Sequence, residues 1–438
     1  MNRIRLTAAF LSAAILSGCS MSGSVESLLV PPKLNSDQNE IYAALTDSVG
    51  TDILLQYPRS GAYRSSFITE DIDGDGTAEA IAFYCHGTDA EDSGALRINI
   101  LDTDSNGNWA SAYDIAGSGT AVDRVIISEL GGSGRKNVII GFIGTTSSDK
   151  NFRSYAYSGG TLTNTFSDSY SSIFITDIDK DGGNELSVIH PNNEYTGKQA
   201  YYSLILDDGA SVYESSTVLL NDETSDFASI ALGYVGVDTL AVFIDGLSDG
   251  QLSTEIIYSI SGTLRNPLYL SESESIKDTV RSNGYFSTDI DLDGIIEIPT
   301  LTYALGYTED SKDAFYITNW NVMDNFTITK KYSGYYSISD GYCFLIPNRW
   351  DGVVTIKSDA ENGDIVFYKY RINILNSNEE LMRIAAVTKE YYNEKLEDGY
   401  TLINSNNNIY YMYKTPENTD EPLILTEAEI LNGFKLMI

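Results

Sequence analysis

The segment Asp71-Ile72-Asp73-Gly74-Asp75-Gly76-Thr77-Ala78-Glu79 places aspartate at positions one, three and five, glycine at six and glutamate at nine. The pattern returns as Asp177-Ile178-Asp179-Lys180-Asp181-Gly182-Gly183-Asn184-Glu185 and as Asp289-Ile290-Asp291-Leu292-Asp293-Gly294-Ile295-Ile296-Glu297. Short β-branched runs flank each copy, so we expect each copy to be a loop that joins two strands. The copies begin 106 and 112 residues apart, which is too long for one supersecondary unit.

Two weaker copies lie midway between the full ones. Residues 127–134 precede the apolar run 138–142, and residues 230–233 precede the run 240–243. Including them reduces the period to about 50–58 residues, the length of a four-stranded unit. A unit of this size cannot bury both faces of its sheet alone, so we expect a mainly β fold in which the units stack as the blades of a β-propeller. Five blades are recognisable, and flanking strands would supply a sixth or seventh.

The rest of the chain between residues 50 and 335 reads as strands. Short runs of β-branched or aromatic residues at 80–84, 97–101 and 255–260 are bounded by Gly, Asn, Asp and Ser. Helical periodicity is absent from this part, and a short helix is expected before it, near residues 40–45.

Three aspartates on one tight turn repel each other unless a cation lies among them. Calcium accepts six to eight hard oxygen ligands in flexible geometry, and the glycine at position six allows the sharp turn. The EF-hand is excluded, because its glutamate comes at position twelve and helices flank it. Asp-Gly clusters are often simple turns. Three copies with glutamate at the same offset nevertheless favour a structural calcium ion in up to three loops.

The three loops and their flanking strands resemble FG-GAP/VCBS repeats, the calcium-loop blades of integrin-like β-propellers, over about residues 52–333. The resemblance implies that calcium binds between the first two strands of a blade. The implied ligands are Asp71, Asp73, Asp75, Glu79, Asp177, Asp179, Asp181, Glu185, Asp289, Asp291, Asp293 and Glu297. Lys180 and Leu292 replace the glycine after the second aspartate, and Ile295 replaces a polar residue, so the second and third sites are expected to bind more weakly.

The N-terminus has the features of an export signal. Arg3 and Arg5 precede an apolar stretch at 6–16, which is too short to cross a bilayer. The sequence Leu16-Ser17-Gly18-Cys19 resembles a bacterial lipobox, with an ordinary signal peptide as the alternative. We therefore expect a lipoprotein signal peptide at 1–18, acylated Cys19, and a polar tether with the short helix at 19–50. Acyl chains would hold the protein to the cell membrane on its extracytoplasmic face.

The repeat pattern is no longer seen after about residue 335, which is the expected end of the propeller that begins at residue 51. Strands are expected at 353–357, 364–373, 380–388 and 408–413, and a capping box at Thr426 and Glu429 predicts a terminal helix. Residues 336–438 would thus form a small α+β domain that resembles PsbP-like domains, although further propeller strands are the alternative. Cys85 and Cys343 either pair or lie buried as small apolar residues.

The composition of the chain excludes some classes of function. With 28 basic against 62 acidic residues, the net charge is −34, which excludes a nucleic-acid surface. The chain has two histidines and neither a Gly-x-Ser-x-Gly nor a His-Glu-x-x-His motif, so we do not expect an enzyme. The favoured function is a monomeric binding or adhesion module for an unidentified protein or carbohydrate ligand. The alternatives are an extracellular polysaccharide hydrolase or lyase, and an envelope assembly factor.

Overall fold

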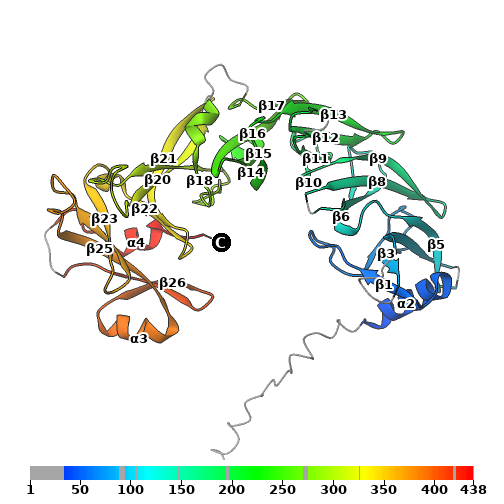
Figure 1. Cartoon of the computed structure of the whole chain (residues 1–438), viewed down its shortest axis with the longest axis horizontal. Coiled ribbons are helices and arrows are strands. Elements are labelled where there is room, and N and C mark those ends of the chain that lie inside the picture. The colour runs from blue at the N-terminus through cyan, green and yellow to red at the C-terminus, as the bar shows by residue number, and fades with distance from the viewer. Residues whose placement is uncertain are drawn as a thin grey trace, which may run out of the picture. The chain divides into compact units, whose positions relative to one another are not determined.

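The computed structural model describes residues 34–87, 94–104, 106–146, 148–193, 197–269, 275–324, 326–417 and 421–437. These residues form six antiparallel sheets of four or five strands and three short α-helices, which confirms the mainly β prediction (Figure 1). The predicted signal peptide and Cys19 lie outside the described residues. None of the helices in the described part of the chain is long and apolar enough to cross a membrane.

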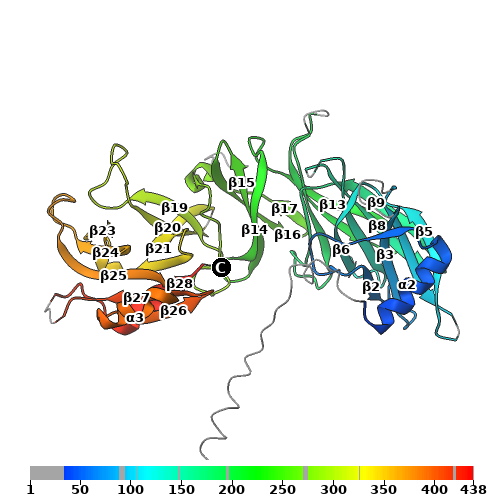
Figure 2. The same cartoon turned by 60° about the horizontal axis from the view of Figure 1, so that its bottom comes forward.

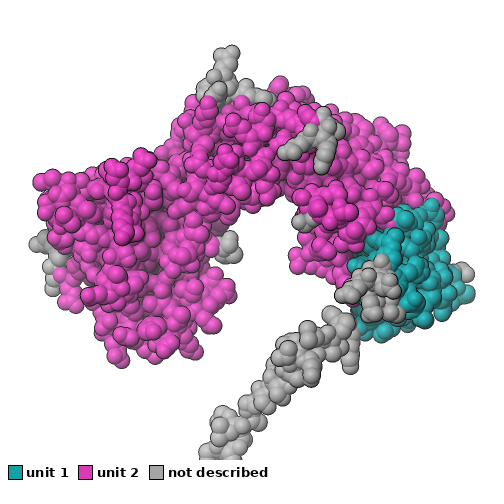
Figure 3. All heavy atoms as spheres, viewed as in Figure 1, with its two compact units in different colours: residues 1–56, 65–71, 76–116 teal, residues 57–64, 72–75, 117–438 magenta. Residues whose placement is uncertain are grey.

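The chain divides into two compact units, coloured separately in Figure 3. The first comprises residues up to 56, 65–71 and 76–116, and the second comprises residues 57–64, 72–75 and 117–438. The division differs from the predicted domains, and the predicted boundary at 335/336 falls inside a strand of the second unit.

The first unit is one sheet covered by a helix. Its elements are α2 (Ser36–Val49), β1 (Ile53–Gln56), β2 (Phe67–Glu70), β3 (Glu79–His86), β4 (Arg97–Thr103) and β5 (Trp109–Ala116). Strand β3 is central and pairs with β1, β2 and β4. Asn35 caps α2 in a capping box with Gln38, and Ile41 and Leu45 pack into the core of the sheet. The predicted N-terminal helix is present and longer than expected.

The second unit begins with three sheets that follow one another along the chain (Figure 2). Their strands are β6 (Ala121–Glu129), β7 (Lys136–Ile143), β8 (Lys150–Ser158) and β9 (Thr161–Ser169); β10 (Ser172–Thr176), β11 (Glu185–His190), β12 (Tyr201–Asp207) and β13 (Val212–Leu219); and β14 (Asp226–Val235), β15 (Thr239–Ser248), β16 (Gln251–Ile260), β17 (Thr263–Arg265) and β18 (Arg281–Ser282). A 3-10 helix, η1 (Ser275–Thr279), precedes β18.

Two five-stranded sheets complete the second unit. One contains β19 (Ile298–Tyr303), β20 (Tyr316–Asp324), β21 (Thr327–Ser337), β22 (Tyr342–Ile346) and β28 (Phe434–Leu436), and the other contains β23 (Val354–Asp359), β24 (Asp364–Lys369), β25 (Glu379–Thr388), β26 (Thr401–Asn406) and β27 (Ile409–Lys414). The remaining elements are η2 (Asn348–Trp350), α3 (Lys389–Glu397) and α4 (Glu427–Gly433). The predicted capping box at Thr426 and Glu429 begins α4.

The boundary predicted at 335/336 lies within β21, which pairs with β22 in one sheet. Through β28, residues near the C-terminus extend this same sheet. The last hundred residues therefore supply two strands of the fifth sheet, β22 and β28, and the whole of the sixth.

The core of the second unit lies between consecutive sheets. Ile139 and Phe152 pack against Val188 of the next sheet, and Val188's neighbour Ile189 belongs to the following cluster with Val242. Later clusters join β15 and β16 to β19, and β22 to β24. Sheet-on-sheet packing of this kind is what the repeat predicts, because each unit leaves an apolar face for its neighbour. The closed propeller and its blade count stay predictions.

Candidate cation sites in the strand-joining loops

The repeat loops occupy equivalent places in their sheets. The first lies between β2 and β3 and the second between β10 and β11, each joining two paired strands. The third leads into β19, and its ends are held by an isolated antiparallel bridge between Thr288 and Glu297. The first weaker copy, residues 127–134, covers the end of β6 and the turn before β7, whereas residues 230–233 of the second lie inside β14. The sequence thus predicted correctly that the first and second full copies are loops between paired strands.

The backbone of the three full loops is the same. In each, the amide of the glycine at position six donates to the first aspartate: Gly76 to Asp71 at 3.2 Å, Gly182 to Asp177 at 3.2 Å and Gly294 to Asp289 at 2.7 Å. These glycines have φ of +94°, +91° and +90°, a region that disfavours any residue with a Cβ.

Position four of each loop is also left-handed. Gly74 has φ of +81°, whereas Lys180 and Leu292 adopt +58° and +63°. Side chains at such angles are strained by about 1–2 kcal/mol. Lys180 and Leu292 therefore strain the backbone of the second and third loops, whereas Gly74 adopts the same conformation in the first loop without strain.

The second loop gathers four carboxylates. Asp177, Asp179, Asp181 and Glu185 each offer an oxygen, and these oxygens all lie within 4.8 Å of one another. Glu185 begins β11, is only 3% exposed, and accepts a hydrogen bond from the Ile178 amide at 2.9 Å. Oδ1 of Asp177 is buried and accepts no hydrogen bond. Four acids thus meet at a point where one is already removed from water.

Electrostatics in the second loop favour a bound cation. Burial, followed by repulsion from the three aspartates, raises the pKa of Glu185 to about 7. Among the described residues, no lysine or arginine pairs with these carboxylates. Lys180 turns away, because its Nζ donates to the Asp238 carbonyl at 2.8 Å. The donor set, all oxygen and highly charged, suits a hard divalent ion.

The third loop contains its own cation. Nζ of Lys331, on β21, lies 2.9 Å from Asp291, 2.7 Å from Asp293 and 2.7 Å from Glu297. Glu297 is fully buried, and it accepts from the Ile290 amide at 2.9 Å, as Glu185 does from Ile178. The ammonium therefore lies where the second loop has only carboxylate oxygens.

Lys331 and the acids of the third loop alter each other's pKa values. Burial lowers the pKa of Lys331, but its bonds to the three acids outweigh burial and raise it above its ordinary value. Burial raises the pKa of Glu297, and Lys331 opposes that rise. The Tyr332 hydroxyl also donates to Asp291 at 2.6 Å. Lys331 was not predicted, because it lies 34 residues beyond Glu297 and belongs to no recognisable motif.

The first loop is divided between the two units. Asp71 and Glu79 belong to the first unit, where their carboxylate oxygens lie within 4.8 Å of each other and Glu79 is fully buried at the start of β3. Asp73 and Asp75 belong to the second unit, and the Asp75 amide donates to Asp73 at 3.2 Å.

Other sheets neutralise buried acids with fixed cations. Beside the weaker copy between β6 and β7, Arg135 forms a bidentate pair with buried Asp207 at 2.7 and 2.9 Å. In the sixth sheet, fully buried Asp364 lies between Lys395 at 2.7 Å and Arg383 at 3.2 Å. These two acids need no added ion, because the chain itself provides the opposite charge.

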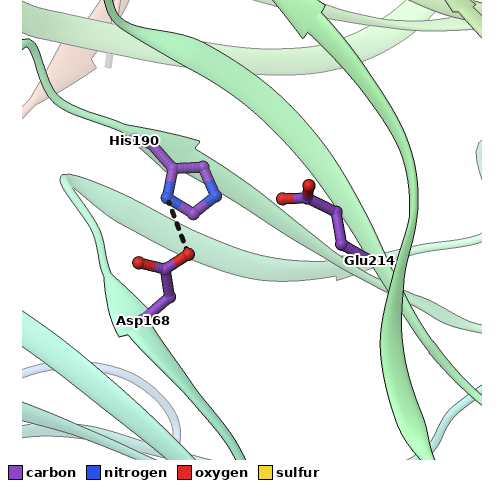
Figure 4. Close-up of side chains that lie close together, drawn as sticks. All are labelled: Asp168, His190 and Glu214. Carbon is purple, nitrogen blue, oxygen red and sulfur yellow. Dashed lines mark ion pairs between the residues drawn. The ribbon is translucent and has the colours of Figure 1, made fainter. Parts of the chain in front are cut away.

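A separate group contains the buried histidine. Asp168, His190 and Glu214 each offer one ligand atom within 4.8 Å of the others (Figure 4). Nε2 of His190 lies 2.8 Å from Ser203 Oγ, and Nδ1 lies 3.8 Å from Asp168 Oδ2. Burial lowers the pKa of His190 to about 4, so the ring is neutral at pH 7. Although Ser, His and Asp follow the order of a hydrolytic triad, Ser203 is fully buried and no substrate can reach it.

A cavity of about 410 Å³ lies near η1 in the second unit. Asp222, Glu223 and Asp249 line it together with Tyr269 and Lys277. The Tyr269 hydroxyl donates to Asp222 at 3.2 Å. None of these acids belongs to a repeat loop, and no sequence pattern singled them out.

No protein-family model matches the chain, and no curated protein sequence matches it. Among solved structures, it is similar to the exotype rhamnogalacturonan lyase YesX, with TM-score 0.28 and 12% identity over 71% of this chain and 60% of the lyase. A rhamnogalacturonan lyase from Bacillus licheniformis gives 0.29 and 14% over 82% and 62%, and a Lactobacillus plantarum protein gives 0.30 and 10% over 72% and 82%. The chain thus spans about 60% of the length of these lyases. Likenesses of this size do not establish a shared activity.

Proposed function

We propose that the chain is an extracytoplasmic lipoprotein, anchored through Cys19, whose β-sheet repeat is a calcium-stabilised scaffold for binding a protein or glycan ligand. The observation that carries the calcium assignment is the second loop, where three aspartates surround buried Glu185 without a lysine or arginine partner in the described residues. Paired strands flank the first and second loops, and loops held on such a scaffold commonly serve recognition.

Calcium is proposed at the second loop through Asp177, Asp179, Asp181 and Glu185. At the first loop it is proposed from the sequence pattern alone, which repeats that of the second. When bound, the ion would neutralise the clustered carboxylates and join the loop to the start of the following strand. In the third loop Lys331 supplies the positive charge, so no calcium is proposed there. The proposal is therefore two calcium ions, where the sequence predicted up to three.

Thermal unfolding with calcium and with a chelator tests whether calcium stabilises the fold. Addition of calcium is expected to raise the midpoint of thermal unfolding, because only the folded loops assemble the ligand set. Elemental analysis of the dialysed protein is expected to find two calcium ions per chain. An unchanged midpoint together with no bound calcium would refute the calcium assignment while leaving the lipid anchor untouched.

A polysaccharide lyase or hydrolase is the second candidate, and the 410 Å³ cavity favours it. Asp222 and Glu223 line this cavity outside the repeat loops, and carboxyl groups are the side chains that acid–base chemistry on a glycan uses. A screen of anionic and neutral polysaccharides should measure both binding and release of new chain ends. Binding without release supports the binding module, whereas release that Glu223→Gln abolishes supports the enzyme.

A further inference from the structure

Three cavities adjoin one another in the second unit. The first, of about 410 Å³, and the second, of about 710 Å³, share Asp222 and Glu223 in their linings. The second shares Lys198 and Gln199 with a third cavity of about 270 Å³. The first two volumes fall within the range of about 300–1,000 Å³ that is usual for ligand sites. We call the three cavities together the groove.

The loop of residues 221–225 lies between the first two cavities and is held from both sides. Both carboxylate oxygens of fully buried Glu255 accept from the Asn221 amide, at 3.0 and 3.1 Å. The Asn221 side chain accepts from the Glu223 amide at 3.1 Å, and Asn192 donates to a carbonyl of the loop at 2.7 Å. A loop that is already fixed loses little conformational entropy when a ligand binds to it.

Uncharged amides and hydroxyls make up most of the polar lining of the groove. Examples are Ser248 and Gln251 in the first cavity, Asn193 and Ser225 in the second and Thr217 in the third. Side-chain amides and hydroxyls both donate and accept hydrogen bonds. Sugar hydroxyls do the same, so this lining complements a glycan without any fixed charge.

An aromatic ring of fixed orientation lines the first cavity. Tyr269 is partly exposed, and its hydroxyl accepts from Gln199 at 2.9 Å and donates to Asp222 at 3.2 Å. A ring fixed in this way offers flat amphipathic contact area at a low cost in conformational entropy. The apolar face of a sugar ring packs well against such a surface.

Among the described residues that line the groove, charged side chains alternate in sign along its length. In order from the first cavity to the third, they are Lys277 and Asp249, then Asp222 and Glu223, then Lys198, and finally Glu214. A polymer that carries one sign of charge on every unit therefore meets side chains of the same sign. An uncharged polymer avoids this repulsion.

We propose that the groove binds one chain of a neutral polysaccharide, which runs through all three cavities. The assignment rests on the proposed binding function and narrows its ligand to an uncharged glycan. A protein segment fits less well, because protein interfaces are centred on buried apolar or aromatic anchors. The side chains shared between the cavities are all polar.

Calorimetry of the full chain with oligosaccharides, in excess calcium and at physiological salt, tests the ligand class. The probes are the disaccharides and hexasaccharides of neutral galactan, glucan and mannan, with hexagalacturonate as the anionic probe. One neutral hexasaccharide is expected to bind about tenfold more tightly than its disaccharide, because it contacts more than one cavity. Hexagalacturonate should not bind. Binding of hexagalacturonate alone, or of no neutral hexasaccharide, would overturn the proposal.

Two truncations test whether the cavities act as one groove. Gln251→Ala alters only the first cavity and Asn193→Ala only the second, yet each should weaken the same hexasaccharide about fivefold, the equivalent of one hydrogen bond. Asn376→Ala, at an exposed position outside the groove, is the matched control and should leave binding unchanged. Binding that only one truncation weakens, or that the control weakens equally, would contradict a single groove.

The same samples separate this proposal from the proposed function. The rise in the unfolding midpoint with calcium is measured on each variant without sugar. If that rise persists while no neutral hexasaccharide binds, the glycan assignment fails alone, and a calcium-stabilised scaffold with a protein ligand is left standing.

Discussion

The second and third repeat loops have one backbone and two sources of positive charge. Both hold a buried glutamate with an amide hydrogen bond of 2.9 Å, and both direct a glycine amide at their first aspartate. In the third loop, Lys331 bridges three acids. In the second, the acids face one another, and the pKa of Glu185 rises to about 7. The comparison teaches that the loop sequence sets the shape, whereas a distant strand decides whether an ion is needed.

The largest expected effect comes from removing the lysine. Lys331→Met leaves three acids, one fully buried, without their cation, and without calcium it should lower the free energy of unfolding by about 3–5 kcal/mol. Calcium should restore most of this loss and bind in one additional equivalent. Chemical denaturation and calcium titration measure the two effects.

The neighbouring residue provides a matched control for this change. Lys330 pairs with exposed Asp351 at 3.2 Å, so Lys330→Met should cost less than about 1 kcal/mol and should not alter the number of calcium ions. Equal losses in the two variants would mean that Lys331 does not act as the internal cation of the third loop.

A smaller effect, of opposite sign in the two loops, is expected from glutamine substitution. In chelator at pH 8, Glu185→Gln removes a buried uncompensated charge and should stabilise the protein, whereas Glu297→Gln removes a partner of Lys331 and should destabilise it. Each change is expected to be on the order of 1–3 kcal/mol. Urea denaturation of both variants measures it, and shifts of the same sign would contradict the comparison.

The pH dependence of the same experiment follows from the raised pKa. Folding raises the pKa of Glu185 from about 4.5 to about 7, so its contribution is fully present below pH 4.5 and is lost as the pH rises through 7. Burial also raises the pKa of Glu255 to about 7. Between pH 5 and pH 8 the wild-type protein should therefore lose more stability than the Glu185→Gln variant, in which only Glu255 still contributes to the loss.

The smallest expected effect concerns the left-handed position. Leu292 is 88% exposed, so Leu292→Gly relieves the strained backbone without loss of packing and should stabilise the protein by about 0.5–1 kcal/mol. Gly74→Ala is the mirror experiment and should destabilise by a similar amount through its φ of +81° alone, since the added Cβ meets no atom within 4 Å. Urea denaturation resolves both, and a stabilising Gly74→Ala would show that the position carries no strain.

The features that the sequence predicted are local ones. The loops, the strands around them and the capping box of α4 depend on residues within about ten positions, and these predictions were confirmed. Lys331 and the group around His190 were not predicted, because strand pairing and sheet packing bring them together from distant segments. The place of the C-terminal strand was equally inaccessible, because β28 joins the fifth sheet only after the sixth is complete.

The two free thiols among the described residues lie near repeat loops, that of Cys85 after the first and that of Cys343 beyond the third. Cys85 belongs to β3, which begins with Glu79, and Cys343 belongs to β22, the partner of the strand that carries Lys331. Burial raises the pKa of both, that of Cys343 to about 12. Since only an exposed thiolate reacts with alkylating reagents, each cysteine is modified only when its own sheet opens. Alkylation rates thus time the opening of a sheet in each unit separately, with no label added to the protein.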